Sequence, residues 1–140
     1  MKDILSALKT AIPAGMSAIK GAHVVTDPDY LPPAVRFPCV GLKDADDLFS
    51  EGMAQTESEK GTIQIYIYVQ ILKDEASIMG DGINKGVLEL MKDLRTLLNW
   101  NNLGGIIHHA YIPDVFASEI ALSSENVFVQ RKGCRLVYER

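Results

Sequence analysis

The fold is decided by one stretch of the chain, Gly61-Thr62-Ile63-Gln64-Ile65-Tyr66-Ile67-Tyr68-Val69-Gln70-Ile71-Leu72. Apolar residues occupy every second position from Ile63 to Ile71, and glutamine and tyrosine alternate with them. Because successive side chains of a strand point to opposite faces, this alternation predicts one long strand with a buried isoleucine face. The other face carries Tyr66 and Tyr68, which suit solvent or a protein contact, because tyrosine joins apolar area to a polar hydroxyl.

Two other segments have the periodicity of amphipathic helices. From Ile83 to Asn99, apolar residues recur every three or four positions, which predicts a long helix. A shorter helix is predicted over Asp3–Ile12, with Asp3 as its N-cap and Pro13 as its end. The strand and the long helix are each apolar on one side only. Burying one against the other predicts a two-layer α+β fold, a mainly antiparallel sheet with one long amphipathic helix packed on one face.

The remaining segments are predicted to form short strands and connections. Four of the six prolines lie in residues 21–43, so the extended pieces at 23–26 and 38–43 are expected at a sheet edge or in irregular crossings, because proline cannot donate to a strand ladder. Residues 73–82 are predicted to be a polar connection. Further strands are expected over residues 106–113, 116–122 and 127–139. Within the last of them, Lys132–Gly133 is a place where a kink or bulge could form.

Length and composition fit a single domain, residues 1–140, made in the cytosol. The 14 basic and 18 acidic residues give a net charge of −4. This charge argues against sequence-independent binding to nucleic acid, which needs cations to neutralise phosphates. No apolar run is long enough to span a membrane. The two cysteines, Cys39 and Cys134, are expected to be plain buried thiols in a reducing compartment.

Acidic and basic residues are separated along the chain. Residues 44–60 are predicted to be a long exposed acidic loop, because they contain six acids, one lysine and few apolar residues. Four basic residues lie near the C-terminus. These two regions are either ordinary solvated surfaces or complementary patches on successive subunits of a ring. Together with the two tyrosines, the candidate interface residues are Asp44, Asp46, Asp47, Glu51, Glu57, Glu59, Tyr66, Tyr68, Arg131, Lys132 and Arg135.

No catalytic or metal-binding motif stands out. His108 and His109 are adjacent on a predicted strand, so their side chains are expected to point to opposite faces rather than to one metal ion. The glycines at residues 80–86 match neither the phosphate-binding loop of nucleotide-binding proteins nor the dinucleotide-binding pattern. We therefore expect no cofactor, no metal ion and no enzymatic activity.

The order of these elements resembles that of tailed-bacteriophage tail terminators, also called tail completion or tail-to-head joining proteins. The resemblance covers most of the chain and rests on pattern. It comprises the N-terminal helix, the proline-rich segment ending in Phe37-Pro38-Cys39-Val40-Gly41, the exposed loop before the long strand, and the leucine-rich helix followed by a C-terminal β ribbon that ends in Arg135-Leu136-Val137-Tyr138.

The resemblance implies a structural role in the virion. Such proteins form a homohexameric ring that caps the tail tube, stops its elongation and joins it to the head-side connector protein. The implied partners are further copies of this chain, the tail-tube protein and the connector. The implied location is the tail or neck of the virion, after assembly in the bacterial host cytoplasm. No catalytic residues accompany the family, and it has no strict motif from which contact residues can be transferred.

Three other interpretations remain open. The chain could be another neck or minor tail protein. It could instead be a non-viral α+β domain that binds a small ligand or a peptide, which would require a concave apolar pocket. An enzyme would require polar groups that converge in a cleft, for example His108 near Cys134.

Overall fold

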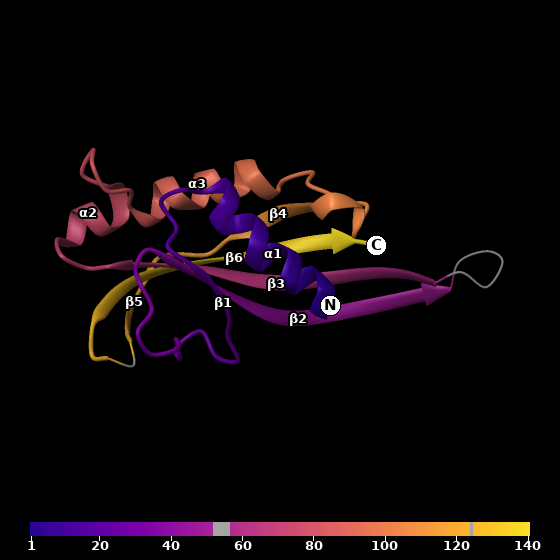
Figure 1. The fold of residues 1–140 in the computed structure, drawn as a ribbon, viewed down its shortest axis with the longest axis horizontal. Helices are drawn as coiled ribbons and strands as arrows, with labels where there is room; N and C mark the ends of the chain where they lie inside the picture. The colour runs from indigo at the N-terminus through magenta and orange to yellow at the C-terminus, as the bar shows by residue number, and fades with distance from the viewer. Residues whose placement is uncertain (52–56, 124) are drawn as a thin grey trace.

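The computed structural model describes residues 1–51, 57–123 and 125–140, and it is an α+β fold with a six-stranded, mostly antiparallel sheet (Figure 1). The strands are β1 (Ala22–Val24), β2 (Cys39–Glu51), β3 (Glu57–Gln70), β4 (His109–Val115), β5 (Glu119–Leu122) and β6 (Phe128–Glu139). The helices are α1 (Lys2–Gly15), α2 (Asp74–Met79) and α3 (Val87–Leu98), with a short 3-10 turn at Leu103–Gly105. The strand order is β1-β2-β3-β6-β4, and β5 also pairs with β6. Among these pairs, only β1 with β2 is parallel.

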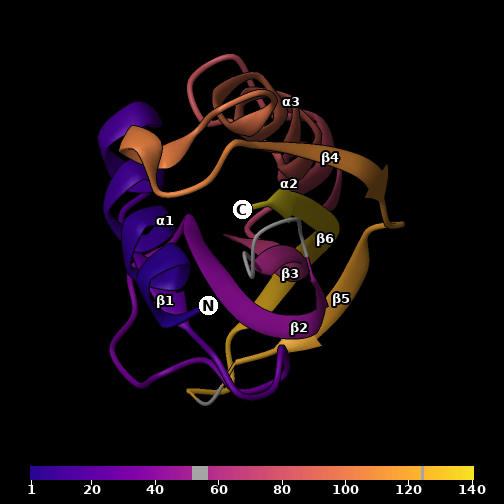
Figure 2. The same ribbon diagram turned by 90° about the vertical axis from the view of Figure 1, so that its right-hand side faces the viewer.

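The main core lies between the sheet and helices α1 and α3, which cover the same face of the sheet (Figure 2). Ile63, Ile65 and Ile67 of β3 are fully buried there, so the predicted isoleucine face is confirmed. Helix α1 contributes Ile4, Leu8 and Ile12, and α3 contributes Val87, Leu90, Met91, Leu94 and Leu98. These apolar faces form one continuous core because each of them is apolar on one side only.

A second, smaller cluster lies on the opposite face of the sheet. It consists of Val25, Leu31, Cys39, Tyr68 and Val129, and the proline-rich segment after β1 covers it. Tyr68 is only 1% exposed, and its hydroxyl donates to the carbonyl oxygen of Pro28 at 2.6 Å. The expectation of a solvated or partner-facing Tyr68 is therefore wrong, because a segment about 40 residues earlier in the chain folds over it.

Helices α1 and α3 differ from the predicted helices in their lengths and in the residues at which they begin. Helix α1 has 14 residues and α3 has 12, so there are two helices of similar length instead of one long and one short. Pro13 lies inside α1, which continues to Gly15 because the Met16 N–H still donates to the Ile12 carbonyl at 2.9 Å. Asp3 is a first-turn residue and not the N-cap.

The connection before α3 also differs from the prediction. Residues 74–79 form helix α2, where a polar connection was expected. Helix α3 begins at Val87, because Asp81 accepts hydrogen bonds from the backbone N–H groups of Ile83 and Asn84 and so forms a turn there. Ile83 is consequently 91% exposed.

The predicted loop at 44–60 is wrong for the residues that the structure describes. Strand β2 continues to Glu51 and β3 begins at Glu57, and the two pair in antiparallel register up to Glu51 opposite Glu57. The part of the expected loop that covers residues 52–56 lies outside the described residues. The expected exposure is confirmed for Asp44, Asp46, Asp47, Glu51 and Glu57. It is wrong for Glu59, whose side chain is only 12% exposed because Tyr138 and Arg140 contact it.

Two register shifts bend the sheet. One lies between Asp44 and Asp47 in β2, and the other lies between Tyr111 and Asp114 in β4, beside Pro113. The register of β3 with β6 has no shift from Lys60 to Gln70, so the bulge considered at Lys132–Gly133 is absent from this strand pair. Proline has no N–H for a strand ladder, which explains why the irregularity falls at Pro113 on β4, an edge strand of the sheet.

Candidate functional site

The most distinctive surface feature is a two-stranded arm, defined here as residues 47–51 of β2 and 57–60 of β3. Strand β1 pairs with β2 only as far as Leu42, and β6 pairs with β3 only as far as Lys60. Figure 1 shows the arm extending beyond the helices at one end of the molecule's longest axis. A two-stranded ribbon with no core of its own is marginally stable in water, and packing against another surface would stabilise it.

The two faces of the arm differ in chemistry. Register and alternation place Phe49 opposite Glu59, and Glu51 opposite Glu57, on the same face as Asp47. The other face carries Leu48 opposite Lys60, and Ser50 opposite Ser58, whose hydroxyl oxygens are 2.5 Å apart. Phe49 is 55% exposed and Leu48 is 69% exposed. We call the first of these the acidic face, because it joins four carboxylates to one aromatic ring.

A hydrogen-bond network anchors the base of the acidic face to the body of the molecule. The hydroxyl of Tyr138 on β6 lies 2.6 Å from Oδ1 of Asp47 and 2.7 Å from Oε1 of Glu59. Gly61 leaves room for this contact, since a Cβ there would overlap the Tyr138 hydroxyl and the Asp47 carboxylate. Burial, together with the hydrogen bonds to Asp47 and Glu59, raises the pKa of Tyr138 above its ordinary value. The phenol therefore remains a donor.

The six candidate acids do not form a single group. Asp47, Glu51, Glu57 and Glu59 share the acidic face of the arm. Asp44 lies at the start of the β2 register shift, and Asp46 lies within it. The sequence pattern therefore located the acidic region correctly, but only the strand register shows which of its carboxylates share a face.

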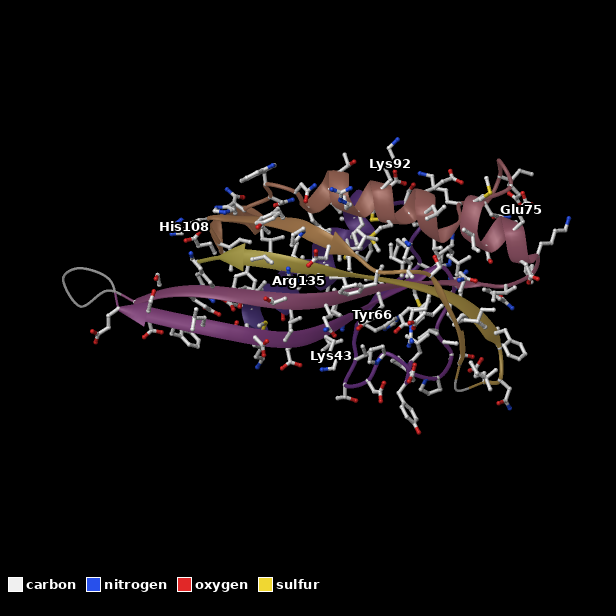
Figure 3. The ribbon with its side chains drawn as sticks, turned by 180° about the vertical axis from the view of Figure 1, so that it is seen from behind. Lys43, Tyr66, Glu75, Lys92, His108 and Arg135 are labelled. Atoms are coloured by element: carbon white, nitrogen blue, oxygen red, sulfur yellow. The ribbon has the colours of Figure 1, made fainter. Side chains whose placement is uncertain are left out.

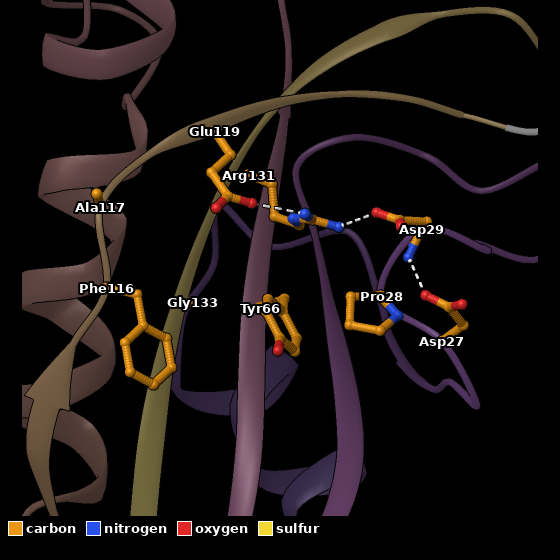
Figure 4. A pocket seen from close by; sticks show the side chains of 9 residues that line it. All are labelled: Asp27, Pro28, Asp29, Tyr66, Phe116, Ala117, Glu119, Arg131 and Gly133. Atoms are coloured by element: carbon orange, nitrogen blue, oxygen red, sulfur yellow. Dashed lines mark hydrogen bonds and ion pairs between the residues drawn. The ribbon is translucent and has the colours of Figure 1, made fainter.

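Arg131 and Tyr66 meet at a small cavity on the sheet face opposite the helices (Figure 4). The cavity has a volume of about 200 Å³. The Arg131 guanidinium lies 5.7 Å from the Tyr66 ring centroid, pairs with Asp29, and donates to Oε2 of Glu119 at 2.7 Å. Its side chain is 14% exposed. Burial opposes the charge of Arg131, but the hydrogen bonds with Glu119 and Asp29 outweigh it and raise the pKa.

Arg131 therefore links separate segments of its own chain through these ion pairs. Through Glu119 it joins β6 to β5. Through Asp29 it joins β6 to the proline-rich segment that covers the second cluster. A cation held by two carboxylates of its own chain has little free charge to offer a second molecule. The structure therefore places Arg131 beside Tyr66 but does not bring it near the acidic arm.

The other C-terminal cations also have partners within the chain. Lys132 donates to the Phe116 carbonyl oxygen at 2.8 Å, and Arg135 pairs with Asp114 at 2.5 Å. Arg135 lies in a row across the sheet with Gln64 and Lys43, on the face that Figure 3 shows toward the viewer. Arg140 joins Asp3 to Glu59 at the base of the arm. These pairings leave the C-terminal bases as a mixed surface and not as a purely basic one.

Sequence reasoning did not find two exposed aromatic positions. Phe49 was expected inside a loop, and only its strand register shows that it lies among carboxylates. Trp100 is exposed beside β4. Its ring stacks with Tyr111, with the ring centroids 6.0 Å apart, and is tilted against the ring of His109 at a centroid distance of 5.5 Å. An apolar residue in an otherwise charged segment was the only signal available for Phe49.

The described residues contain no group of three or more histidine, cysteine or acidic side chains arranged to hold a metal ion. Cys39 lies in the second cluster and Cys134 in the main core, on opposite faces of the sheet. Both are buried free thiols, as expected.

No protein-family model matches the chain, and neither does any curated protein. Within the part of the chain that the structure describes, none of the helices has the length and apolar character needed to cross a membrane.

Proposed function

We propose that this protein is a tail terminator of a tailed bacteriophage. It forms a homohexameric ring that caps the tail tube, stops tube elongation and joins the tube to the head-side connector protein. The observation that carries this proposal is the arm, a pair of strands that extends from the sheet at one end of the molecule and leaves Leu48, Phe49, Glu51 and Glu57 exposed. Such an element is suited to contact with a neighbour.

The architecture supports the same role. The helices and the mostly antiparallel sheet are elements whose order along the chain resembles that of tail terminators, with a strand pair at 47–51 and 57–61 in place of the expected loop. A contact between the arm and a different surface of an identical chain is heterologous, and heterologous contacts close into rings when the rotation permits. The net charge of −4 also suits a ring around a DNA channel, because like charges repel and passing DNA is not retained.

The proposal is tested by measuring mass in solution. Sedimentation or native mass spectrometry is run at several concentrations, with and without the tail-tube protein encoded by the same genome. We expect a discrete species of six times the 15.4 kDa subunit mass. We also expect tubes that polymerise in its presence to stop growing. A chain that stays monomeric under both conditions contradicts the ring, and a hexamer that leaves tube growth unchanged contradicts the terminator role.

A further inference from the structure

A groove lies beside α2 and the connection from α2 to α3. Its volume is about 470 Å³, and its lining comes from three parts of the chain, within residues 17–20, 37–38 and 69–85. Phe37, Pro38 and Val69 contribute apolar surface to it. Leu72 and Ile83 line it as well, although they are 82% and 91% exposed. Apolar side chains exposed to this degree around one concave surface are typical of a contact site.

Three lysines also line this groove, Lys20, Lys73 and Lys85. Lys85 pairs with Asp93 at 2.5 Å. Among the described residues, no ion pair joins Lys20 or Lys73 to a carboxylate. Asp81, the acid in the lining, already accepts from two backbone N–H groups. The groove therefore combines apolar surface with cations that are available to a partner.

The acidic face of the arm has the complementary chemistry. Phe49 offers an exposed aromatic ring between carboxylates. Glu51 lies directly opposite Glu57, and like charges in that position destabilise a strand pair. Cations supplied by a partner would remove this repulsion.

Groove and arm cannot meet within one molecule. Figure 1 shows the arm at one end of the longest axis and α2, with its connection to α3, at the other. We propose that the acidic face of the arm of one copy docks in the groove of the next copy, with Phe49 against Leu72 and Ile83 and the glutamates against Lys20 and Lys73. This inference rests on the proposed ring, and it identifies the two surfaces that join its subunits.

Charge exchange between the two surfaces tests the docking. The groove variant is K20E/K73E and the arm variant is E51K/E57K, and all four positions are exposed. Each variant alone is expected to lose assembly, because residues 51 and 57 of its arm then carry the same charge as residues 20 and 73 of its groove. An equimolar mixture is expected to regain the six-subunit species, because the two variants can alternate around an even-numbered ring. Assembly is measured by sedimentation, with tail-tube protein present if the wild-type chain requires it.

Matched controls separate this contact from general effects of charge. K9E/K92E makes the same charge change on the outer surfaces of α1 and α3, where Figure 3 shows Lys92 projecting from the body, and it should assemble as the wild type does. Phe49→Ser should weaken assembly about tenfold or more, whereas Leu48→Ser on the other face of the arm should not.

The outcomes distinguish the two proposals. If the wild type assembles and the groove and arm variants each assemble equally well, the docking is wrong and the terminator function stands. If the mixture does not recover assembly, the pairing of these two surfaces is also wrong. If the wild-type chain never associates, alone or with tail-tube protein, both proposals fail.

Discussion

Cys39 and Cys134 show how strongly the interior isolates a single side chain. Both are completely buried, Cys39 behind the proline-rich segment and Cys134 under the helices. Burial raises the pKa of each thiol to about 12. Because the thiolate is the reactive form of cysteine, both thiols are unreactive while the fold is intact.

We therefore predict that neither cysteine reacts with iodoacetamide at pH 8 in the native protein. Both should react in urea, at rates on the order of a hundredfold higher, since unfolding restores access and an ordinary thiol pKa. Mass spectrometry after timed labelling measures this difference. Rapid labelling of either residue without denaturant would show that its side of the sheet opens readily.

At the scale of elements, the arm and the sheet have separate roles. Strands β2 and β3 are shared between them, with buried residues such as Leu42 and Ile65 in the sheet and exposed residues such as Phe49 in the arm. Tyr138 marks the boundary, because its hydroxyl contacts Asp47 and Glu59, the carboxylates of the arm that lie nearest the body. Stability should therefore depend on the sheet, and assembly on the arm.

Shortening the arm tests this division. Replacing residues 50–58 by Asn-Gly joins Phe49 to Glu59 through a two-residue hairpin turn and keeps the contacts of Tyr138. We expect the free energy of unfolding in urea to change by less than about 1 kcal/mol, because the described residues that are removed are not buried. Assembly should be lost. A much larger loss of stability would mean that the arm packs on the core.

At the scale of the whole molecule, the two ends of the chain are joined. Arg140 donates to both carboxylate oxygens of Asp3, and its backbone exchanges hydrogen bonds with Glu59. The first helix, the last strand and the base of the arm therefore meet at one point. The hydrogen bond from Arg140 lowers the pKa of Asp3 from 3.8 to about 2.

This contact predicts a dependence of stability on pH. The Asp3 pKa is lower in the folded chain, so its contribution is complete above about pH 4 and is lost as the pH falls toward 2. Asp3→Asn should be less stable than the wild type by about 0.5 kcal/mol at pH 6, a value limited by solvent exposure. The two proteins should be equally stable near pH 2. Urea unfolding at both pH values measures the effect, and adding Arg140→Gln should cost little more.

The sequence patterns predicted some elements well and missed others for identifiable reasons. The strand at 63–71 and the helix ending at Leu98 were predictable, because burial on one side leaves a periodic signal in the chain. The strands of the arm leave no such signal, since residues exposed on both faces need not alternate. The burial of Tyr68 was also unpredictable, because it depends on residues 25–37 folding across the sheet.

Sequence alone is sufficient to predict the buried isoleucine face, the apolar sides of α1 and α3, the net charge and the location of the acids. The apolar faces follow from the side-chain periods of strands and helices, and the charge and its location follow from composition and residue order. Three features became visible in the folded molecule alone. Four of the acids share a face with Phe49, and the C-terminal bases are engaged within the chain. Lysines line an apolar groove at the end opposite the arm. Such surfaces are assembled from segments distant in sequence, so long-range pairing and packing determine them.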